Sequence, residues 1–258
     1  SVLTNNFSSL RLIILPTREC NFRCIYCYEE KRNERMDNTT KDNLIKATKD
    51  YLTKHSTVKS LQLEWFGGEP LLEYETVLDV SAELHDYCIS NDIAFSMSMT
   101  TNGYLLTKQR AEKLLEFNLV FYQITLDGFE EFHDNLRPLR NGAPTFSTIY
   151  KNLLDLKEIK NEDIKVMIRI NYYIDMLESI DKFLLKLKAD FNDDRFSFYM
   201  IKINPPKDKD LGLDFVTNKS EYLAQDYIFD LYSKLDIGID KYLVNLNPVS
   251  SMCYARYN

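Results

Sequence analysis

The chain has 258 residues, of which 45% are hydrophobic and 28% charged, a composition typical of a folded domain rather than a disordered one. Its net charge of −7, with Lys and Arg scattered among acidic residues, argues against a nucleic-acid partner, because phosphate binding needs a basic surface. The longest apolar runs, such as residues 10–15, are too short to cross a bilayer, and five cysteines are an odd number for a disulfide framework, so we expect a cytoplasmic protein without a membrane partner.

The hydrophobic pattern alternates short strand-like runs with longer segments of helical periodicity. Strands are expected at residues 10–15, 60–66, 94–100, 120–126, 165–174 and 196–203. Helices are expected from about residue 38 and at residues 73–90, 108–117, 146–159, 177–189 and 220–235, with a long polar loop before residue 146. This alternation predicts parallel βα units, and six units are too few for a closed eight-stranded barrel. We therefore expect an α/β fold, a partial (β/α)6 TIM-type barrel whose open parallel sheet is covered by outer helices.

Three cysteines, Cys20, Cys24 and Cys27, follow the first expected strand in a short polar loop. Three thiolates can bind a four-iron cluster and leave one iron open to a further ligand. Two other interpretations remain. The spacing also suits a buried stripe on one helix face, and a structural zinc site could form if His55 or Cys88 supplied the fourth ligand.

The pattern CxxxCxΦC, with aromatic Tyr26 before the last cysteine, resembles the signature of the radical S-adenosylmethionine (SAM) superfamily. The resemblance implies that Cys20, Cys24 and Cys27 hold a [4Fe-4S] cluster whose open iron is chelated by the amino and carboxylate groups of SAM. It also implies that Tyr26 lies near the adenine.

Gly67, Gly68, Glu69 and Pro70 follow the second expected strand and resemble the GGEP motif that binds the SAM amino group in this superfamily. Two glycines let the backbone approach a ligand closely, and a carboxylate can pair with an ammonium group. The same four residues would otherwise be taken as an ordinary turn from strand to helix.

Short polar segments follow the third and fourth expected strands. Thr101 and Asn102 belong to a segment that resembles the TNG motif of the superfamily, and Thr125 occupies the serine position of its S-x-D-G motif. The resemblance implies that these residues contact the ribose of SAM.

Two arginines complete the expected SAM site. Arg137 ends a sequence that resembles the HDxxR motif of the peptide-modifying branch, in which the arginine contacts the SAM carboxylate. A guanidinium suits a carboxylate because it can donate two parallel hydrogen bonds. Arg169 and Asn171 resemble an R-x-N pattern of related enzymes, although two inward-facing strand residues can also simply bond to each other.

The resemblance implies reductive cleavage of SAM to a 5′-deoxyadenosyl radical that abstracts hydrogen from a substrate. The electron would come from an external donor of the flavodoxin or ferredoxin type. The order of motifs resembles the branch that carries a SPASM or twitch extension, which implies a peptide or protein substrate. Phe66 stands where sulfatase maturases commonly have glutamine, so we expect a maturase of ribosomally made peptides that installs a thioether, a carbon-carbon cross-link or an epimer. An anaerobic sulfatase maturase or a small-molecule radical SAM enzyme is the alternative, and no residue for later acid or base steps is evident.

The last residues resemble the start of that extension. We expect residues 1–235 to form the radical SAM core and residues 236–258 to form a linker and the truncated beginning of the auxiliary domain. Cys253 would be the first ligand of an auxiliary [4Fe-4S] cluster, whose other ligands are missing from this sequence.

Overall fold

The computed structural model describes residues 8–204, 211–216, 218–235 and 237. Within these residues the strands are β1 Ser9–Ile14, β2 Ser60–Trp65, β3 Ala94–Thr101, β4 Leu119–Thr125, β5 Lys165–Tyr172 and β6 Phe196–Lys202. The α-helices are α1 Asn38–Lys54, α2 Tyr74–Ser90, α3 Lys108–Leu115, α4 Glu130–Leu136, α5 Phe146–Lys157, α6 Ile180–Asp190 and α7 Asn218–Lys234. Two short 3-10 helices, η1 Pro70–Glu73 and η2 Ile174–Glu178, precede α2 and α6.

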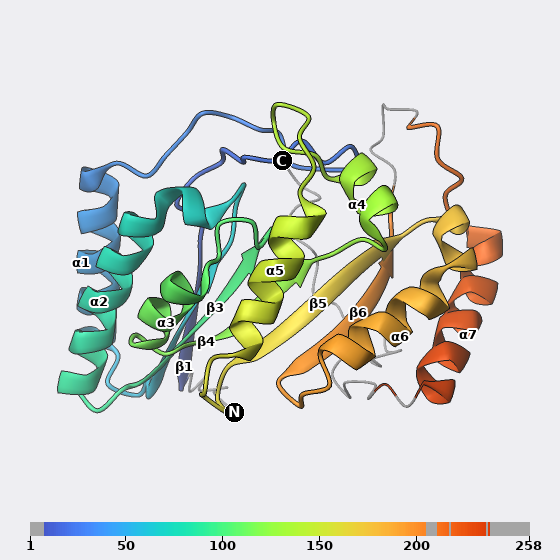
Figure 1. Cartoon of the computed structure of the whole chain (residues 1–258). Helices are drawn as coiled ribbons and strands as arrows, with labels where there is room; N and C mark the ends of the chain where they lie inside the picture. The colour runs from blue at the N-terminus through green and yellow to red at the C-terminus, as the bar shows by residue number, and fades with distance from the viewer. Residues whose placement is uncertain (1–7, 205–210, 217, 236, 238–258) are drawn as a thin grey trace, which may run out of the picture.

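The strands form one parallel sheet whose spatial order, β1-β2-β3-β4-β5-β6, is the order of the chain. The helices lie in sequence along one face of this sheet, from α1 and α2 beside β1 to α6 and α7 beside β6 (Figure 1). A sheet that keeps chain order with its helices on one side is part of a barrel, since a doubly wound sheet reverses its strand order. The expected open, partial (β/α)6 barrel is confirmed.

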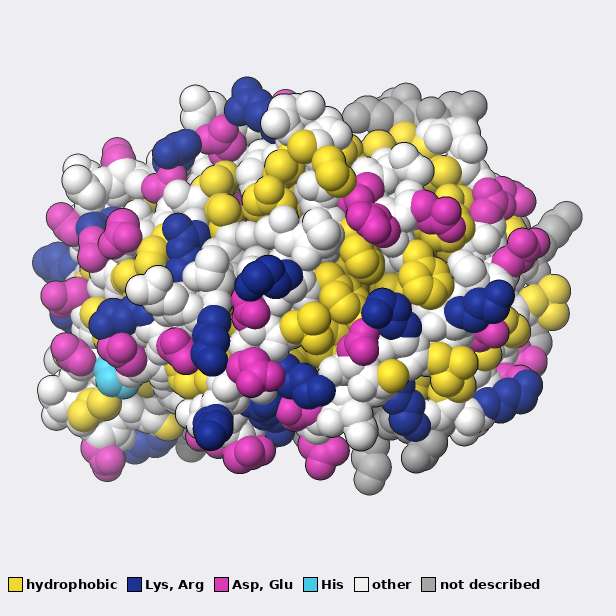
Figure 2. All heavy atoms as spheres, in the orientation of Figure 1, with side chains coloured by type: hydrophobic (Ala, Val, Ile, Leu, Met, Phe, Trp, Pro, Cys, Tyr) yellow, Lys and Arg dark blue, Asp and Glu magenta, His cyan; other side chains and the backbone are white. Residues whose placement is uncertain are grey.

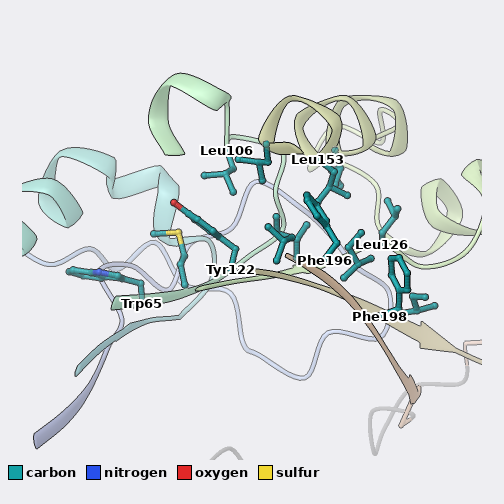
Figure 3. Close-up of a cluster of buried hydrophobic side chains, with 14 of the residues drawn as sticks. Trp65, Leu106, Tyr122, Leu126, Leu153, Phe196 and Phe198 are labelled. Carbon is teal, nitrogen blue, oxygen red and sulfur yellow. The ribbon is translucent and has the colours of Figure 1, made fainter. Parts of the chain in front are cut away.

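The core fills the space between the sheet and the helices. Alternate residues of β2, namely Leu61, Leu63 and Trp65, are buried because successive side chains of a strand point to opposite faces. Figure 3 shows this layer, in which Trp65 of β2, Tyr122 of β4 and Phe196 of β6 lie in one row above the sheet and Leu153 of α5 packs from the helix side; Tyr122 and Leu153 are fully buried. The packed layer fixes the strands, so their carboxyl ends become a rigid edge on which loops can carry a site.

The structure departs from the sequence prediction between the fourth and fifth strands. The segment expected to be a polar loop contains α4, whose first turn has two acidic residues, Glu130 and Glu131, where the helix dipole favours negative charge. The fifth strand ends at Tyr172, two residues earlier than expected, because η2 begins at Ile174. At α1, the cap is the carboxylate of Asp37, which accepts a hydrogen bond from the backbone of residue 40 and starts the helix.

The helix-covered face of the molecule mixes basic and acidic side chains without a block of either sign (Figure 2). Hydrophobic side chains gather on this face near α5 and α6, to which the partly exposed Leu154 and Leu185 belong. In the described part of the chain, no helix is both long and apolar enough to span a membrane.

Candidate functional site

A cavity of about 140 Å³ opens at the carboxyl edge of the sheet. It is lined by residues from the loops that follow β1 and β2, from the end of β3 and the residue after it, from β4 and β5, and from the end of α4. The residues predicted from the sequence that line it are Cys20, Cys24, Tyr26, Cys27, Gly67, Gly68, Thr101, Asn102, Thr125, Arg137 and Arg169. Glu69 and Pro70 lie outside its lining, and Cys253 lies outside the described residues. The structure therefore brings together side chains that are up to 149 positions apart, from Cys20 to Arg169.

The cysteine loop is not helical, so the interpretation as a buried helical stripe is wrong. It lies antiparallel to the segment after α4, with Phe22 bridged to Leu139. Backbone hydrogen bonds run from Arg23 N to Pro138 O at 2.8 Å and from Ile25 N to Leu136 O at 3.0 Å. This pairing fixes the loop through its backbone and leaves the thiols to face the cavity.

The three thiols differ in burial. Cys20 is buried, whereas Cys24 and Cys27 are partly exposed to the cavity. Burial raises the pKa of the Cys24 thiol to about 11 and raises that of Cys20, while the positive charge of Arg137 acts against both shifts. Thiols with such raised pKa values stay protonated near neutral pH, and binding of a metal would displace these protons.

The glycines after β2 are required by the cysteine loop. A Cβ on Gly68 would lie 2.1 Å from the carbonyl oxygen of Glu19, and a Cβ on Gly67 would lie 2.5 Å from that of Thr17. Gly68 N donates to Thr17 O at 3.1 Å, so the two loops share backbone hydrogen bonds. Both glycines line the cavity, but the close approach that demands them is to a neighbouring loop, which the sequence analysis did not anticipate.

Glu69 lies behind the cavity and is fully buried. Its carboxylate accepts hydrogen bonds from Thr101 Oγ1 at 2.7 Å, Asn102 N at 2.7 Å and Leu71 N at 3.0 Å. Asn102 in turn donates through Nδ2 to Asn21 Oδ1 at 2.8 Å. One carboxylate thus ties the loops after β2 and β3 to the cysteine loop. Pairing of Glu69 with a ligand ammonium group stays a prediction, since its oxygens already have these partners.

A second buried carboxylate, Asp127, lies at the end of β4. Tyr26 donates its hydroxyl proton to Asp127 Oδ2, and Asn171 donates to Oδ1 from its backbone N at 2.7 Å and from Nδ2 at 3.0 Å. Arg137 Nη1 donates to the Tyr26 oxygen at 2.6 Å and lies 3.8 Å from Asp127 Oδ2. Burial raises the pKa of Asp127, and the charge of Arg137 opposes that shift. The expected SAM-binding tyrosine and arginine therefore belong to one charged cluster.

The guanidinium of Arg137 is incompletely bonded. Its side chain is 9% exposed, and its Nε is buried without a hydrogen-bond partner among the described residues. A buried donor without an acceptor is costly, by about 1–3 kcal/mol, and calls for an explanation. Arg169 Nε donates a hydrogen bond to Asn171 Oδ1 at 3.0 Å, so these two strand residues bond to each other, which is one of the alternatives expected from the sequence. Arg169 also lines the cavity.

A second layer holds Asp127 and Arg137 from behind. His133, in α4, is fully buried; its Nδ1 accepts from Asp127 N at 3.0 Å and its Nε2 lies 3.1 Å from Thr145 Oγ1. Thr145 Oγ1 donates to the carbonyl oxygen of Arg137 at 2.8 Å. Burial lowers the pKa of His133 well below its usual range, so the imidazole is neutral. His133 and Asp127 belong to the segments that resemble the HDxxR and S-x-D-G motifs, but the motifs alone assign them no position in the network.

The cavity lining includes side chains that the sequence analysis did not select. These are Phe22, Tyr28, Glu29, Lys31, Thr100 and Gln123; Phe66 and Asn171, which the sequence analysis named without a place in the site, also line the cavity. Glu29 and Lys31 follow the last cysteine in a segment that carries no motif of its own, so only the fold reveals that they face the thiols. Gln123 could have been found from its position two residues before Thr125 on the same face of β4.

The donor set fits an iron-sulfur cluster better than a single ion. Three thiols face one cavity, as a cluster with one open iron requires. A structural zinc ion needs four ligands close around one point, and neither fourth ligand considered from the sequence reaches this cavity. Cys88 is buried in α2 and, like His55, does not line the cavity.

Comparisons with known proteins agree with this geometry. The model of the family described as "Radical SAM superfamily" matches residues 14–185. An uncharacterised protein of Methanocaldococcus jannaschii is 31% identical over 214 residues, which cover 82% of this chain and 68% of that protein. The radical SAM cyclopropyl synthase TigE of Paramaledivibacter caminithermalis is 24% identical over 242 residues, covering 88% of this chain and 47% of the synthase.

Among solved structures, native anSMEcpe with bound AdoMet and Cp18Cys peptide has the same fold, with a TM-score of 0.66 at 20% identity. The match covers 88% of this chain and 59% of the anSMEcpe chain. The present chain thus spans less than two thirds of the length of TigE and of anSMEcpe.

Proposed function

This chain belongs to the radical SAM superfamily, and from that premise we propose that Cys20, Cys24 and Cys27 bind a [4Fe-4S] cluster that cleaves SAM. The observation that carries the proposal is the cavity itself, in which three thiols lie together with the buried guanidinium of Arg137. The family implies both the cluster and SAM, and the donor set at this edge of the sheet fits them.

Different residues of the cavity would bind different parts of SAM. Arg137 has a buried Nε without a partner, and a carboxylate of SAM would supply the acceptor that this donor lacks. The backbone at Gly67 and Gly68 also lines the cavity and would face the amino group. Tyr26, fixed by Asp127 and Arg137, would lie beside the adenine.

Short polar side chains would bind the ribose. Thr101, Asn102 and Thr125 line the cavity, and Arg169 extends into it from β5. Thr101 and Asn102 are held by Glu69, so the ligand meets side chains that are already positioned. When bound, the cluster and SAM together supply one-electron cleavage of a carbon-sulfur bond and a 5′-deoxyadenosyl radical that abstracts hydrogen. The chain's own contribution is to orient SAM and exclude water.

We propose a peptide as substrate, with maturation of a ribosomally made peptide as the outcome. One observation supports this class: anSMEcpe, which shares the fold, is described with a bound peptide. Phe66 lines the cavity beside the glycines, in place of the glutamine common in sulfatase maturases. A sulfatase maturase or a small-molecule enzyme is the second candidate, because the curated relatives include a serine-type anaerobic sulfatase-maturating enzyme and probable GTP 3′,8-cyclases.

The proposal extends to the rest of the protein. Residues 1–235 would be the catalytic core, and residues 236–258 would lead into an auxiliary domain in which Cys253 is a cluster ligand. An external one-electron donor of the flavodoxin or ferredoxin type would reduce the cluster.

The test is anaerobic reconstitution with iron and sulfide, reduction with dithionite in the presence of SAM, and chromatography for 5′-deoxyadenosine. The parent chain should form the product and Cys24→Ala should not. Cys88→Ala is the matched control, since Cys88 is a buried cysteine outside the cavity and its removal should leave product formation in place. If the parent chain assembles no cluster and forms no product, the proposed function is wrong.

A further inference from the structure

The segment after the last cysteine alternates between the cavity and the solvent. The side chains of Glu29 and Lys31 are only 21% and 20% exposed, whereas those of Glu30 and Arg32 are 69% and 48% exposed. This is the period-two alternation of an extended chain, which points neighbouring side chains to opposite sides. The outward pair bonds to itself, with Arg32 Nη2 donating to Glu30 Oε2 at 2.7 Å. The inward pair lines the cavity with the three thiols.

Lys31 is held next to the cysteines. Its Nζ lies 3.9 Å from Glu29 Oε2, and its pKa is raised above the usual range although burial alone would lower it. Lys31 lines the same cavity as the three cysteines, and the groups that raise its pKa are first Cys27 and then Cys20. The ammonium group therefore lies beside these sulfur atoms, and no role in binding SAM has been assigned to it.

Two cations, the buried Arg137 and the partly buried Lys31, act on different pairs of the three cysteines. The charge of Arg137 acts on Cys20 and Cys24, and the charge of Lys31 acts on Cys20 and Cys27. Arg137 is already committed to Tyr26 and Asp127 and is expected to bind the SAM carboxylate. Lys31 has no such task, and its described ion-pair partner is Glu29, which lines the same cavity.

We propose that Lys31 raises the reduction potential of the cluster by holding a positive charge against the Cys27 side. The inference rests on the proposed function, because it requires that these cysteines bind a cluster. Reduction of a [4Fe-4S] cluster from the 2+ to the 1+ state adds one electron, and a nearby cation stabilises the reduced form more than the oxidised one.

The test is an EPR-monitored redox titration of the reconstituted chain without SAM. Lys31→Gln should lower the midpoint potential, so that the ratio of reduced to oxidised cluster at a fixed poise falls about tenfold, which is 59 mV for a one-electron couple. Lys31→Arg keeps the charge and should retain a potential near that of the parent. Arg32→Gln is the matched control, because it removes the same charge from the same segment on the solvent side, and it should leave the potential unchanged.

Two results would overturn the inference. The first is a parent-like potential for Lys31→Gln with intact iron and sulfide content, and the second is an equal shift in Arg32→Gln, which would reduce the effect to net charge. If Lys31→Gln assembles too little cluster to titrate, comparison of Lys31→Arg with the parent decides: a retained potential supports the inference and a lowered one contradicts it. A parent chain with an EPR-active cluster but no effect of Lys31 would leave the proposed function standing, whereas a parent chain without a cluster would remove both.

Discussion

Two buried carboxylates, Glu69 and Asp127, hold the two sides of the cavity in different ways. Both are fully buried, and burial raises the pKa of both. The hydrogen bonds that described residues donate to the Glu69 carboxylate all come from uncharged groups, two backbone N–H groups and one hydroxyl. Asp127 instead lies 3.8 Å from the guanidinium of Arg137, with the hydroxyl of Tyr26 between them.

This difference distinguishes two parts of the cavity: the Glu69 side, which we call the scaffold side, and the Asp127 side, which we call the binding surface. On the Glu69 side every oxygen has found a donor, so the loops after β1, β2 and β3 are closed on one another. On the Asp127 side one donor of the Arg137 guanidinium is unsatisfied, because its Nε has no hydrogen-bond partner among the described residues. Changes on the first side should therefore cost stability, and changes to Arg137 should cost affinity for the ligand.

The largest expected loss of stability comes from a substitution on the scaffold side. Gly68→Ala places a Cβ 2.1 Å from the carbonyl oxygen of Glu19, so the backbone of one loop must move. We expect a loss of about 3 kcal/mol in the free energy of unfolding and a failure to retain iron after reconstitution, measured by thermal denaturation and iron analysis. Gly142→Ala is the control: no atom lies within 4 Å of its added Cβ, so only the strain of its φ of +84° applies. Equal melting temperatures for the parent and Gly68→Ala would refute the close contact.

The next effect comes from Glu69→Gln. Glutamine keeps the shape of the side chain but replaces one carboxylate oxygen by an NH2 group. That group cannot accept a hydrogen bond, so at least one of the buried donors around Glu69 loses its acceptor. We expect about 2–3 kcal/mol of destabilisation in urea denaturation. Glu64→Gln should cost less than about 1 kcal/mol, because Glu64 pairs with the exposed Arg11 at the surface. A cost for Glu69→Gln as small as that of Glu64→Gln would mean that the scaffold side is not closed.

A smaller effect, on the Asp127 side, is the pH dependence of stability through His133. Its pKa is lowered in the fold by burial first and by the charge of Arg137 second, so the folded state resists protonation. The stability that neutral His133 contributes is fully present above its unfolded pKa of about 6.5 and is lost as the pH falls, by about 1.4 kcal/mol per pH unit. Melting temperatures at pH 7.5 and 5.5 should differ more for the parent than for His133→Asn. The same difference in both proteins would contradict the assignment.

The sequence alone predicts the barrel and the set of loops that forms the cavity, because both follow from local patterns. Strand alternation and the turn residues after each strand put the cysteines, Gly67 and Gly68, and Thr125 at one edge of the sheet, and the structure places them there. The helix at Glu130 was missed, since seven residues without a strong apolar period resemble a polar loop.

Partnerships across the sheet could not be predicted. The sequence offered Glu69 as a ligand for an ammonium group, but which donors reach a buried carboxylate depends on the register of β2 and β3 and on the cysteine loop. Lys31 was also missed, because its direction depends on the extended path of the chain after Cys27. These contacts link distant segments, so no local pattern encodes them.

The most direct test of the division between scaffold and binding surface is equilibrium binding of SAM to the reconstituted chain, compared between the parent and Arg137→Gln. The account predicts that Arg137→Gln binds SAM at least about tenfold more weakly, because the lost guanidinium is the partner of the SAM carboxylate. Arg140→Gln removes an exposed arginine three residues away and should bind SAM like the parent. If folded Arg137→Gln binds SAM with the affinity of the parent, the Asp127 side is not the part of the cavity that awaits the ligand, and the account is contradicted.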